Sequence, residues 1–195
     1  EGGDLWSQNF HGKWSHHKKG RARINVSADT SQAANGTSCS MKIEYKLNDR
    51  SAVTVRLGVK APYYKEHHGK MAYDLSRFSS ITFSLKGKKD HSFLSKPNKI
   101  LATLICYSEK AKSKNGKVAQ YYHRSKVVPD REWKKIEIPF DDFVPSKWTL
   151  NNVVDYPSKP DLSKVLQIFF LVSGFGGDGG HQGSNTIWID EIVLQ

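Results

Sequence analysis

The stretch EWKKIEIPFDDF, residues 132–143, is decisive for the fold. Its two isoleucines alternate with lysine and glutamate, which is typical of a strand with one buried face. Pro139 interrupts the pattern, and because proline has no N–H to donate to a neighbouring strand, it belongs at a sheet edge or a strand end. The stretch therefore predicts a strand over 133–138 that ends at Pro139. Phe140 and Phe143 should then enter the core while the paired aspartates begin a loop.

The same period of two recurs along the rest of the chain, and no stretch shows sustained helical periodicity. Further strands are expected at 39–47, 52–60, 81–85, 100–107, 117–128, 165–173 and 186–194. Residues 165–173 are apolar at both parities, so that strand should be central and covered on both faces. Strands separated by turn residues predict an all-β fold, an antiparallel β-sandwich or jelly roll. We expect residues 1–195 to form one such domain.

Composition narrows the classes of partner. The chain has 195 residues, of which 37% are apolar, and this is enough for a substantial core. It contains no apolar run of about 18 residues, so we expect no membrane span. It does not begin with Met and no apolar signal region leads it, so we expect a mature or excised piece of something larger.

The formal net charge of +11 would attract polyanions such as nucleic acid or acidic polysaccharide. The lysines do not line up along one expected element, which favours a general role in solubility. We therefore expect neither nucleic acid nor a membrane as the partner. Cys39 and Cys106 lie in separate expected strands and lack metal-ligand spacing. They either form a disulfide in a secreted protein or are two small buried residues.

Five segments together resemble a known family. They are GTSCSMKIEYKL (36–47), DLSRFSSITFSLKG (74–87), REWKKIEIPFDDF (131–143), DLSKVLQIFFLVSGFGG (161–177) and IWIDEIVL (187–194). Their order and spacing resemble those of carbohydrate-binding modules of family 11 and of complex I intermediate-associated protein 30 domains. The resemblance implies a galactose-binding-like jelly roll, commonly with a structural calcium. In the carbohydrate-binding members it also implies a concave sheet face that holds a glycan chain.

A glycan site needs aromatic platforms for the flat C–H faces of sugar rings and polar groups for their hydroxyls. Tyr121 and Tyr122 are adjacent in an expected strand, so only one of them can face a ligand. Tyr122 has the more polar neighbours of the same parity, so we expect it on the exposed face. The expected ligand-binding residues are Arg56, Tyr63, Tyr64, Gln120, Tyr122, Arg124 and Trp148. The alternative for each tyrosine is a packing role, and Trp188 is expected to line the core or serve structure.

A calcium site is implied by the same resemblance. Asp190, in the closing IDEI motif, matches the position whose carboxylate often holds structural calcium in such modules. Asp4 would lie close to it if the first and last strands are neighbours. Calcium prefers several oxygen ligands, which these carboxylates and nearby carbonyls can supply. The alternative is that Asp190 caps a turn or pairs with a lysine.

Catalysis has no comparable support. Asp141 and Asp142 are sequence neighbours, so they cannot flank a glycosidic bond from two sides. A lyase acting on acidic glycans would need a base, an acid and a cation, but His123 should point away from Tyr122. We therefore expect a non-catalytic, extracellular carbohydrate-binding module, monomeric and tethered to a polysaccharide-degrading enzyme. Its ligand would be a neutral β-glucan or another plant cell-wall glycan, possibly acidic. The alternatives are a protein-interaction domain of the same fold and the lyase.

Overall fold

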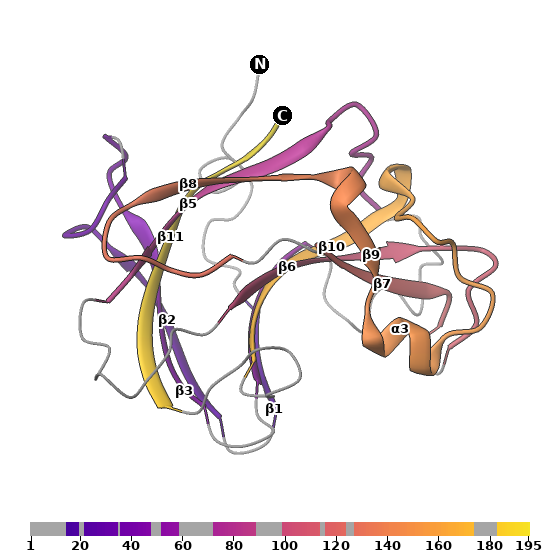
Figure 1. The fold of residues 1–195 in the computed structure, drawn as a ribbon, viewed down its shortest axis with the longest axis horizontal. Coiled ribbons are helices and arrows are strands. Elements are labelled where there is room, and N and C mark those ends of the chain that lie inside the picture. The colour runs from indigo at the N-terminus through magenta and orange to yellow at the C-terminus, as the bar shows by residue number, and fades with distance from the viewer. Residues whose placement is uncertain are drawn as a thin grey trace.

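Two antiparallel sheets face each other across one hydrophobic core (Figure 1). The structure is a computed structural model, and it describes residues 15–19, 22–34, 36–47, 52–58, 72–88, 99–113, 116–123, 127–173 and 183–195. In these ranges no helix is long and apolar enough to cross a lipid bilayer.

The first sheet has six strands in the order β1-β4-β10-β6-β7-β9. Their bounds are β1 Ser15–Lys19, β4 Ala52–Gly58, β10 Val165–Ser173, β6 Ile100–Tyr107, β7 Val118–His123 and β9 Phe143–Pro145. The second sheet has five strands in the order β2-β3-β11-β5-β8. Their bounds are β2 Arg23–Asp29, β3 Ser40–Leu47, β11 Gly183–Leu194, β5 Ser80–Gly87 and β8 Lys134–Pro139. The short helices are η1 Phe140–Asp142, α3 Lys147–Asn152 and η2 Leu162–Lys164.

The core forms because alternate residues of each strand point between the sheets. Phe83 of β5 and Phe170 of β10 meet across the sandwich, edge to face, with ring centroids 5.0 Å apart. The strand β10 lies between β4 and β6 and is buried on both of its faces, as its apolar sequence predicts. Leu166 and Phe169, for example, are 0% and 4% exposed although they do not face the main core.

The strand and the two phenylalanines of segment 132–143 lie as the sequence predicts, whereas the loop expected at the aspartates is a short 3₁₀ helix. The strand β8 lies at the edge of the five-stranded sheet and ends at Pro139. Phe140 and Phe143 are 4% and 0% exposed, so both enter the core. Asp141 and Asp142 continue into η1. The proline therefore marks both a sheet edge and a strand end.

The expected strands are confirmed within a few residues at each end, as far as the described ranges extend. The sequence reasoning missed β1, β2, β9 and the helix α3. The strand β9 has three residues and α3 has six, so neither is long enough to show a period. The thiols of Cys39 and Cys106 are both free, so they form no disulfide. Cys106 is buried, as the alternative expects, whereas Cys39 is half-buried. Complete burial raises the pKa of the Cys106 thiol.

Candidate functional site

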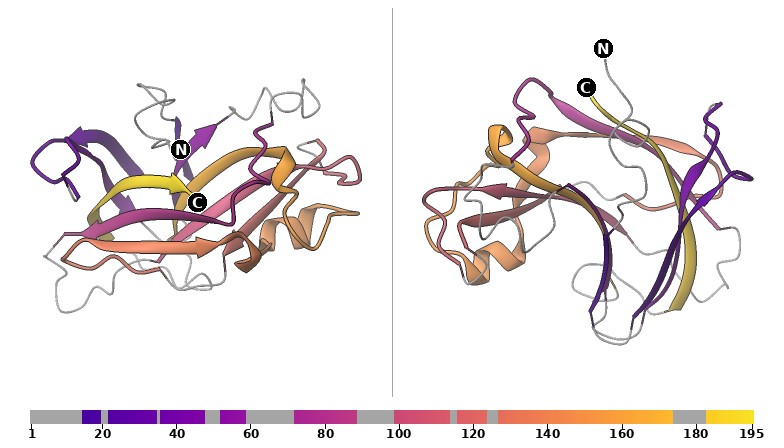
Figure 2. Two further views of the ribbon diagram at one scale, coloured as in Figure 1. Left: turned by 90° about the horizontal axis from the view of Figure 1, so that it is seen from above. Right: turned by 180° about the vertical axis from the view of Figure 1, so that it is seen from behind.

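The outer face of the six-stranded sheet, turned away from the core, gathers several of the expected ligand-binding residues. The strand registers place Arg56, Phe169, Thr103, Tyr122 and Val144 in one row across β4, β10, β6, β7 and β9. Paired residues of neighbouring strands point to the same side of a sheet. The sheet curves so that this outer face lies on the inside of the bend, as seen from behind in Figure 2. The row therefore crosses a concave sheet face.

Arg56 stands above Phe169 in this row. Its Cζ atom lies 5.8 Å from the centroid of the Phe169 ring, within the range of a cation–π contact. Its Nε donates a hydrogen bond of 3.3 Å to Thr54 Oγ1. These contacts hold the guanidinium over the outer face, where it could offer N–H donors to a ligand oxygen.

The two adjacent tyrosines of β7 divide as the parity argument predicts. Tyr121 points into the core, is 1% exposed and donates a 2.9 Å hydrogen bond to the carbonyl of Pro157. Tyr122 points to the outer face and is half-buried. His123 points back into the core, with its ring centroid 6.1 Å from that of Phe143. His123 thus lies away from Tyr122, as expected.

Trp148 reaches the same face from α3 rather than from a strand. The side chain of Ser146 caps the helix by accepting a 3.1 Å hydrogen bond from the Thr149 backbone N–H. Thr149 Oγ1 accepts from the N–H of Gln120 and donates to the carbonyl of Gln120, both at 2.7 Å. This hydroxyl binds the backbone of Gln120 as a partner strand would, so α3 is fixed against β7.

Trp148 packs onto a small apolar cluster on the outer face, separate from the main core. The buried members of this cluster are Tyr107, Val118 and Leu166, and Ile105 and Ala72 are half-buried beside them. The indole itself is half-buried. Trp148, Gln120 and Tyr122 consequently lie on one side of the sheet, which combines two aromatic rings with an amide.

The strands β4, β6, β7, β9 and β10 present little charge on this face. Within the described residues of β4, β6, β7, β9 and β10, the outward-facing side chains include no carboxylate and no histidine. Arg56 is the one cation in that set. Glycoside hydrolysis requires a pair of carboxylates facing the bond, and this set does not supply them.

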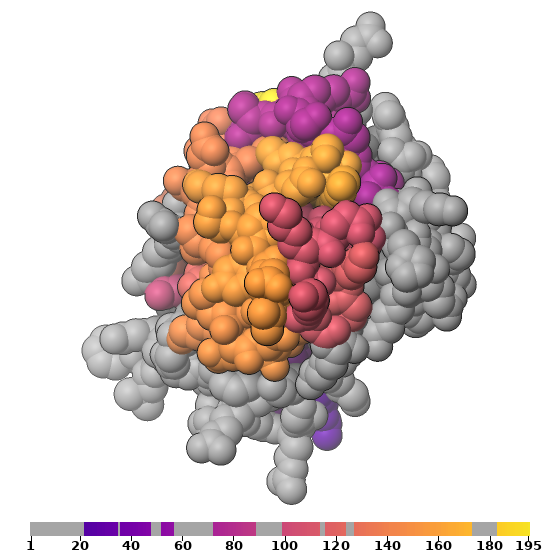
Figure 3. All heavy atoms as spheres, turned by 90° about the vertical axis from the view of Figure 1, so that its right-hand side faces the viewer, coloured from indigo at the N-terminus to yellow at the C-terminus, as the bar shows by residue number. Residues whose placement is uncertain are grey.

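The sequence reasoning missed the end of the sandwich next to Trp148, where residues 107–113 and 116–118 lie beside residues 147–164 (Figure 3). Tyr107 and Lys117 there donate hydrogen bonds of 2.8 and 2.7 Å to the carboxylate of Glu109. The hydrogen bond from Lys117 contributes most, and the one from Tyr107 comes next. Together they hold the pKa of Glu109 below its ordinary value. An open hollow of about 560 Å³ lies beside it, lined by Glu109, Lys110, Lys112, Asp155, Tyr156 and Pro157. No periodic signal in the sequence marks this hollow, because it forms between loops.

Four of the expected site residues, Tyr63, Tyr64, Arg124 and Asp4, lie outside the described residues. The other expected metal ligand, Asp190, is 3% exposed, and protein donors surround its carboxylate. Oδ2 accepts from Ala34 N at 2.9 Å and from Thr37 Oγ1 at 2.5 Å, and Oδ1 accepts from Glu191 N at 2.8 Å.

The part of the chain that the structure describes has no group of three His, Cys, Asp or Glu side chains able to hold a metal ion. In this arrangement N–H and O–H donors contact both oxygens of the Asp190 carboxylate. Calcium at Asp190 stays a prediction.

Of the two roles expected for Trp188, lining the core or serving structure, the first is wrong. Its neighbours Ile187 and Ile189 are 0% and 1% exposed and face the core, so Trp188 faces outward from the five-stranded sheet. The alternation in β11 changes phase at a register shift between Asp190 and Val193, where Glu191 has a positive φ of 49°. This phase change cannot be located from the alternation of the sequence alone.

A β-sandwich with aromatic rings and an amide on a concave sheet face has the architecture of a carbohydrate-binding protein. Comparison with known proteins agrees. Residues 5–195 match the family described as Carbohydrate binding domain 30, and the chain belongs to this family. It is a non-catalytic module that binds polysaccharide. None of the curated proteins matches the chain.

Among solved structures, the chain is similar to the family 11 carbohydrate-binding module of the cellulosomal cellulase Lic26A-Cel5E of Clostridium thermocellum. The TM-score is 0.66 with 18% identity, over 100% of this chain and 94% of the other. A family 11 module of Clostridium thermocellum in complex with a β-1,3-1,4-mixed-linked tetrasaccharide gives 0.62 and 19%, over 96% and 91%. The family 30 module of the cellulosomal cellulase Cel9D-Cel44B of Clostridium thermocellum gives 0.53 and 14%, over 87% and 81%. At these identities the similarity confirms the fold.

Proposed function

We propose that the outer face of the six-stranded sheet binds a neutral β-glucan chain. The observation that carries the proposal is the row from Arg56 to Tyr122, with Gln120 and Trp148 beside it. Tyr122 and Trp148 stack on sugar rings, while Gln120 and Arg56 hydrogen-bond their hydroxyls. On β4, β6, β7, β9 and β10, the outward-facing side chains include one cation and no carboxylate, which suits an uncharged ligand.

The neutral ligand and the attached enzyme are supported by two of the similar structures. One family 11 module is bound to a β-1,3-1,4-mixed-linked tetrasaccharide. Another belongs to a cellulosomal cellulase. By analogy, this module is extracellular and holds an attached polysaccharide-degrading enzyme near its substrate. A few stacking contacts on an open face give dissociation constants of roughly micromolar to millimolar.

The test is the affinity for mixed-linked β-glucan of a Tyr122→Ala variant, measured by isothermal titration calorimetry. Loss of one stacking ring should raise the dissociation constant about tenfold, equivalent to about 1.4 kcal/mol. The thermal midpoint should change little, because Tyr122 is half-buried and outside the main core. Tyr73→Ala is the matched control, since Tyr73 is 49% exposed and lies outside the row. Wild-type affinity in a folded Tyr122→Ala protein would remove Tyr122 from the site.

A further inference from the structure

The outer face of the five-stranded sheet carries a tryptophan between two lysines. The registers of β11 place Trp188 opposite Lys42 of β3 on one side and opposite Lys86 of β5 on the other. All three side chains are half-buried. The exposed part of the Trp188 indole offers a flat apolar surface on which a sugar ring can stack. This sheet is the opposite layer of the sandwich from Tyr122 and Trp148.

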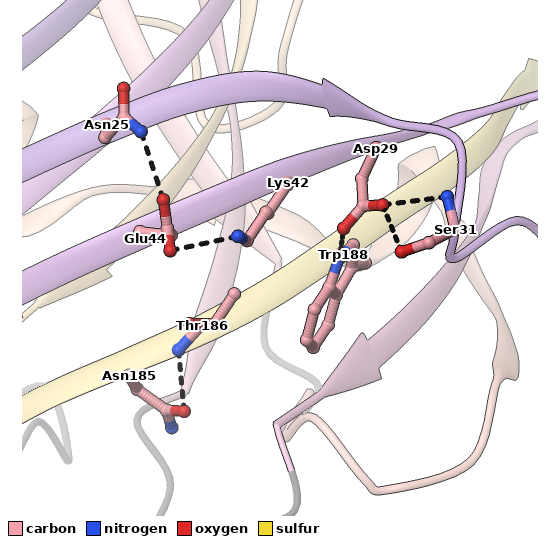
Figure 4. Close-up of polar contacts among 8 residues, drawn as sticks. All are labelled: Asn25, Asp29, Ser31, Lys42, Glu44, Asn185, Thr186 and Trp188. Carbon is pink, nitrogen blue, oxygen red and sulfur yellow. Dashed lines mark hydrogen bonds and ion pairs between the residues drawn. The ribbon is translucent and has the colours of Figure 1, made fainter.

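The indole of Trp188 is held in place by an acidic residue, as Figure 4 shows. Its Nε1 donates a 2.9 Å hydrogen bond to Asp29 Oδ2. Asp29 Oδ1 in turn accepts from Ser31 N at 2.9 Å and from Ser31 Oγ at 2.6 Å. The hydrogen bonds from Ser31 and Trp188 hold the pKa of Asp29 below its ordinary value, so the carboxylate stays ionised and keeps accepting. The ring is therefore a preorganised platform rather than a mobile side chain.

A second tryptophan, Trp133, lies beside Lys86. Trp133 directly precedes β8, and the Nζ atom of Lys86 lies 6.0 Å from the centroid of its ring. Lys86 Nζ also donates a 2.8 Å hydrogen bond to Gln32 Oε1. The lysine is thus positioned close to the two indoles, with its ammonium held by Gln32 and facing the Trp133 ring.

A groove of about 390 Å³ lies on this face over β2, β3 and β11. Its polar lining includes Arg23, Asn25, Glu44, Lys46, Lys88 and Thr186. Glu44 accepts a 3.0 Å hydrogen bond from Asn25 and forms a 3.0 Å ion pair with Lys42 (Figure 4). The groove thus combines three cations with an acceptor and an amide, which is a set suited to a ligand bearing both acidic groups and hydroxyls.

The charge of this face differs from that of the Tyr122 face. Its outward-facing residues include six cations, namely Arg23, Lys42, Lys46, Lys86, Lys88 and Lys135. Against them stand four exposed or half-buried carboxylates among the described residues, of Asp29, Glu44, Glu137 and Glu191. The idea that the lysines are scattered is therefore wrong for this sheet, because alternation and strand pairing bring them together from separate stretches of sequence.

We propose that the outer face of the five-stranded sheet is a second binding surface, which takes an anionic polysaccharide chain. Trp188 and Trp133 stack on its sugar rings, and Lys42, Lys86 and Lys88 pair with its carboxylate or sulfate groups. Glu44 accepts hydrogen bonds from hydroxyl groups, of which a sugar ring has several. A DNA backbone offers phosphates and no hydroxyls, so Glu44 would repel it. This surface is additional to the neutral-glucan face.

The test measures binding of polygalacturonate, which carries carboxylates, and of dextran sulfate, which carries sulfates, at low and at physiological salt. Trp188→Ala should weaken binding of the preferred polymer about tenfold. The pair Lys86→Gln with Lys88→Gln should weaken it about fivefold. The pair Lys110→Gln with Lys112→Gln is the matched control, since it removes the same charge from the hollow beside Glu109. Its effect should be less than twofold.

Three results would overturn the proposal. Equal losses from both lysine pairs would mean that net charge alone attracts the polymer. Weakening of polygalacturonate by Tyr122→Ala, or displacement by mixed-linked β-glucan, would place both glycans on one face. Tighter binding of duplex DNA than of either acidic polymer would make this a nucleic-acid surface. If Trp188→Ala fails to fold, the affinities of Trp133→Ala and of the two lysine-pair variants for the acidic polymers test the proposal instead. The variants at Trp188, Trp133, Lys86 and Lys88 should leave binding of neutral glucan by the other face unchanged, so the two proposals fail separately.

Discussion

Replacing Asp190 with alanine is expected to lower the free energy of unfolding by about 3 kcal/mol, because it removes a buried carboxylate that accepts three hydrogen bonds. Two of the donors, Ala34 N and Thr37 Oγ1, belong to the connection between β2 and β3. The N–H of Ala34, which is 0% exposed, would lose its acceptor in a place that water does not reach. Urea denaturation with a single-transition fit measures the change.

Asp74→Ala is the matched control for this variant. Like Asp190, Asp74 accepts hydrogen bonds from protein donors. Ser76 N and Ser76 Oγ donate to it at 2.9 and 2.6 Å, but Asp74 is exposed. Its loss should therefore cost well under about 1 kcal/mol. Equal costs for Asp74→Ala and Asp190→Ala would contradict the role of burial.

Thermal melts of the same proteins, with and without added calcium, test for an ion at Asp190. A bound ion would raise the thermal midpoint of the wild type and not that of Asp190→Ala.

The substitution Thr149→Val is also expected to lower the free energy of unfolding strongly. The hydroxyl of Thr149 is the acceptor for the Gln120 N–H and a donor to the Gln120 carbonyl, and the residue is 0% exposed. Valine keeps the shape but cannot accept, so a backbone N–H at the edge of β7 is left unpaired. The free energy of unfolding should fall by about 2 kcal/mol. Glucan affinity should fall with it, because α3 carries Trp148.

Thr82→Val is the control for this variant. It makes the same exchange of a hydroxyl for a methyl group, but no loss of stability is expected. Thr82 is 1% exposed, and its hydroxyl has no hydrogen-bond partner among the described residues. Exchanging that hydroxyl for a methyl group should leave the stability unchanged or raise it by up to about 1 kcal/mol. A loss of stability for Thr82→Val as large as for Thr149→Val would show that side-chain packing, and not the hydroxyl contact, decides both results.

The sequence was informative where one rule acts over a long stretch. Strand parity separated Tyr121 from Tyr122 correctly, because β7 has no bulge between Ala119 and His123. Proline chemistry predicted the end of β8, since the missing N–H acts whatever the surroundings. In β11 the same parity rule failed to place Trp188, since alternation defines two faces but does not say which one meets the core.

Features that depend on pairing between distant segments could not be predicted. Trp148 was chosen as an aromatic residue, but the contact that brings it to the site runs through Thr149 to Gln120, 29 residues away. The basic face of the five-stranded sheet also depends on pairing between segments that are far apart in the sequence. Lys42, Lys86 and Lys135 come from three strands, and only the strand order makes them neighbours. Placing them requires the sheet order, which a single sequence without repeats does not reveal.

The position of β8 has a consequence for how the protein behaves at high concentration. An edge strand exposes unpaired N–H and C=O groups, and a second copy could add to it and start a fibre. This edge carries Lys134 and Lys135, both exposed, and ends at a proline that cannot donate. Like charges on two approaching edges repel, and the proline interrupts any shared ladder. The segment that defines the fold therefore also protects the folded protein against aggregation through its sheet edge.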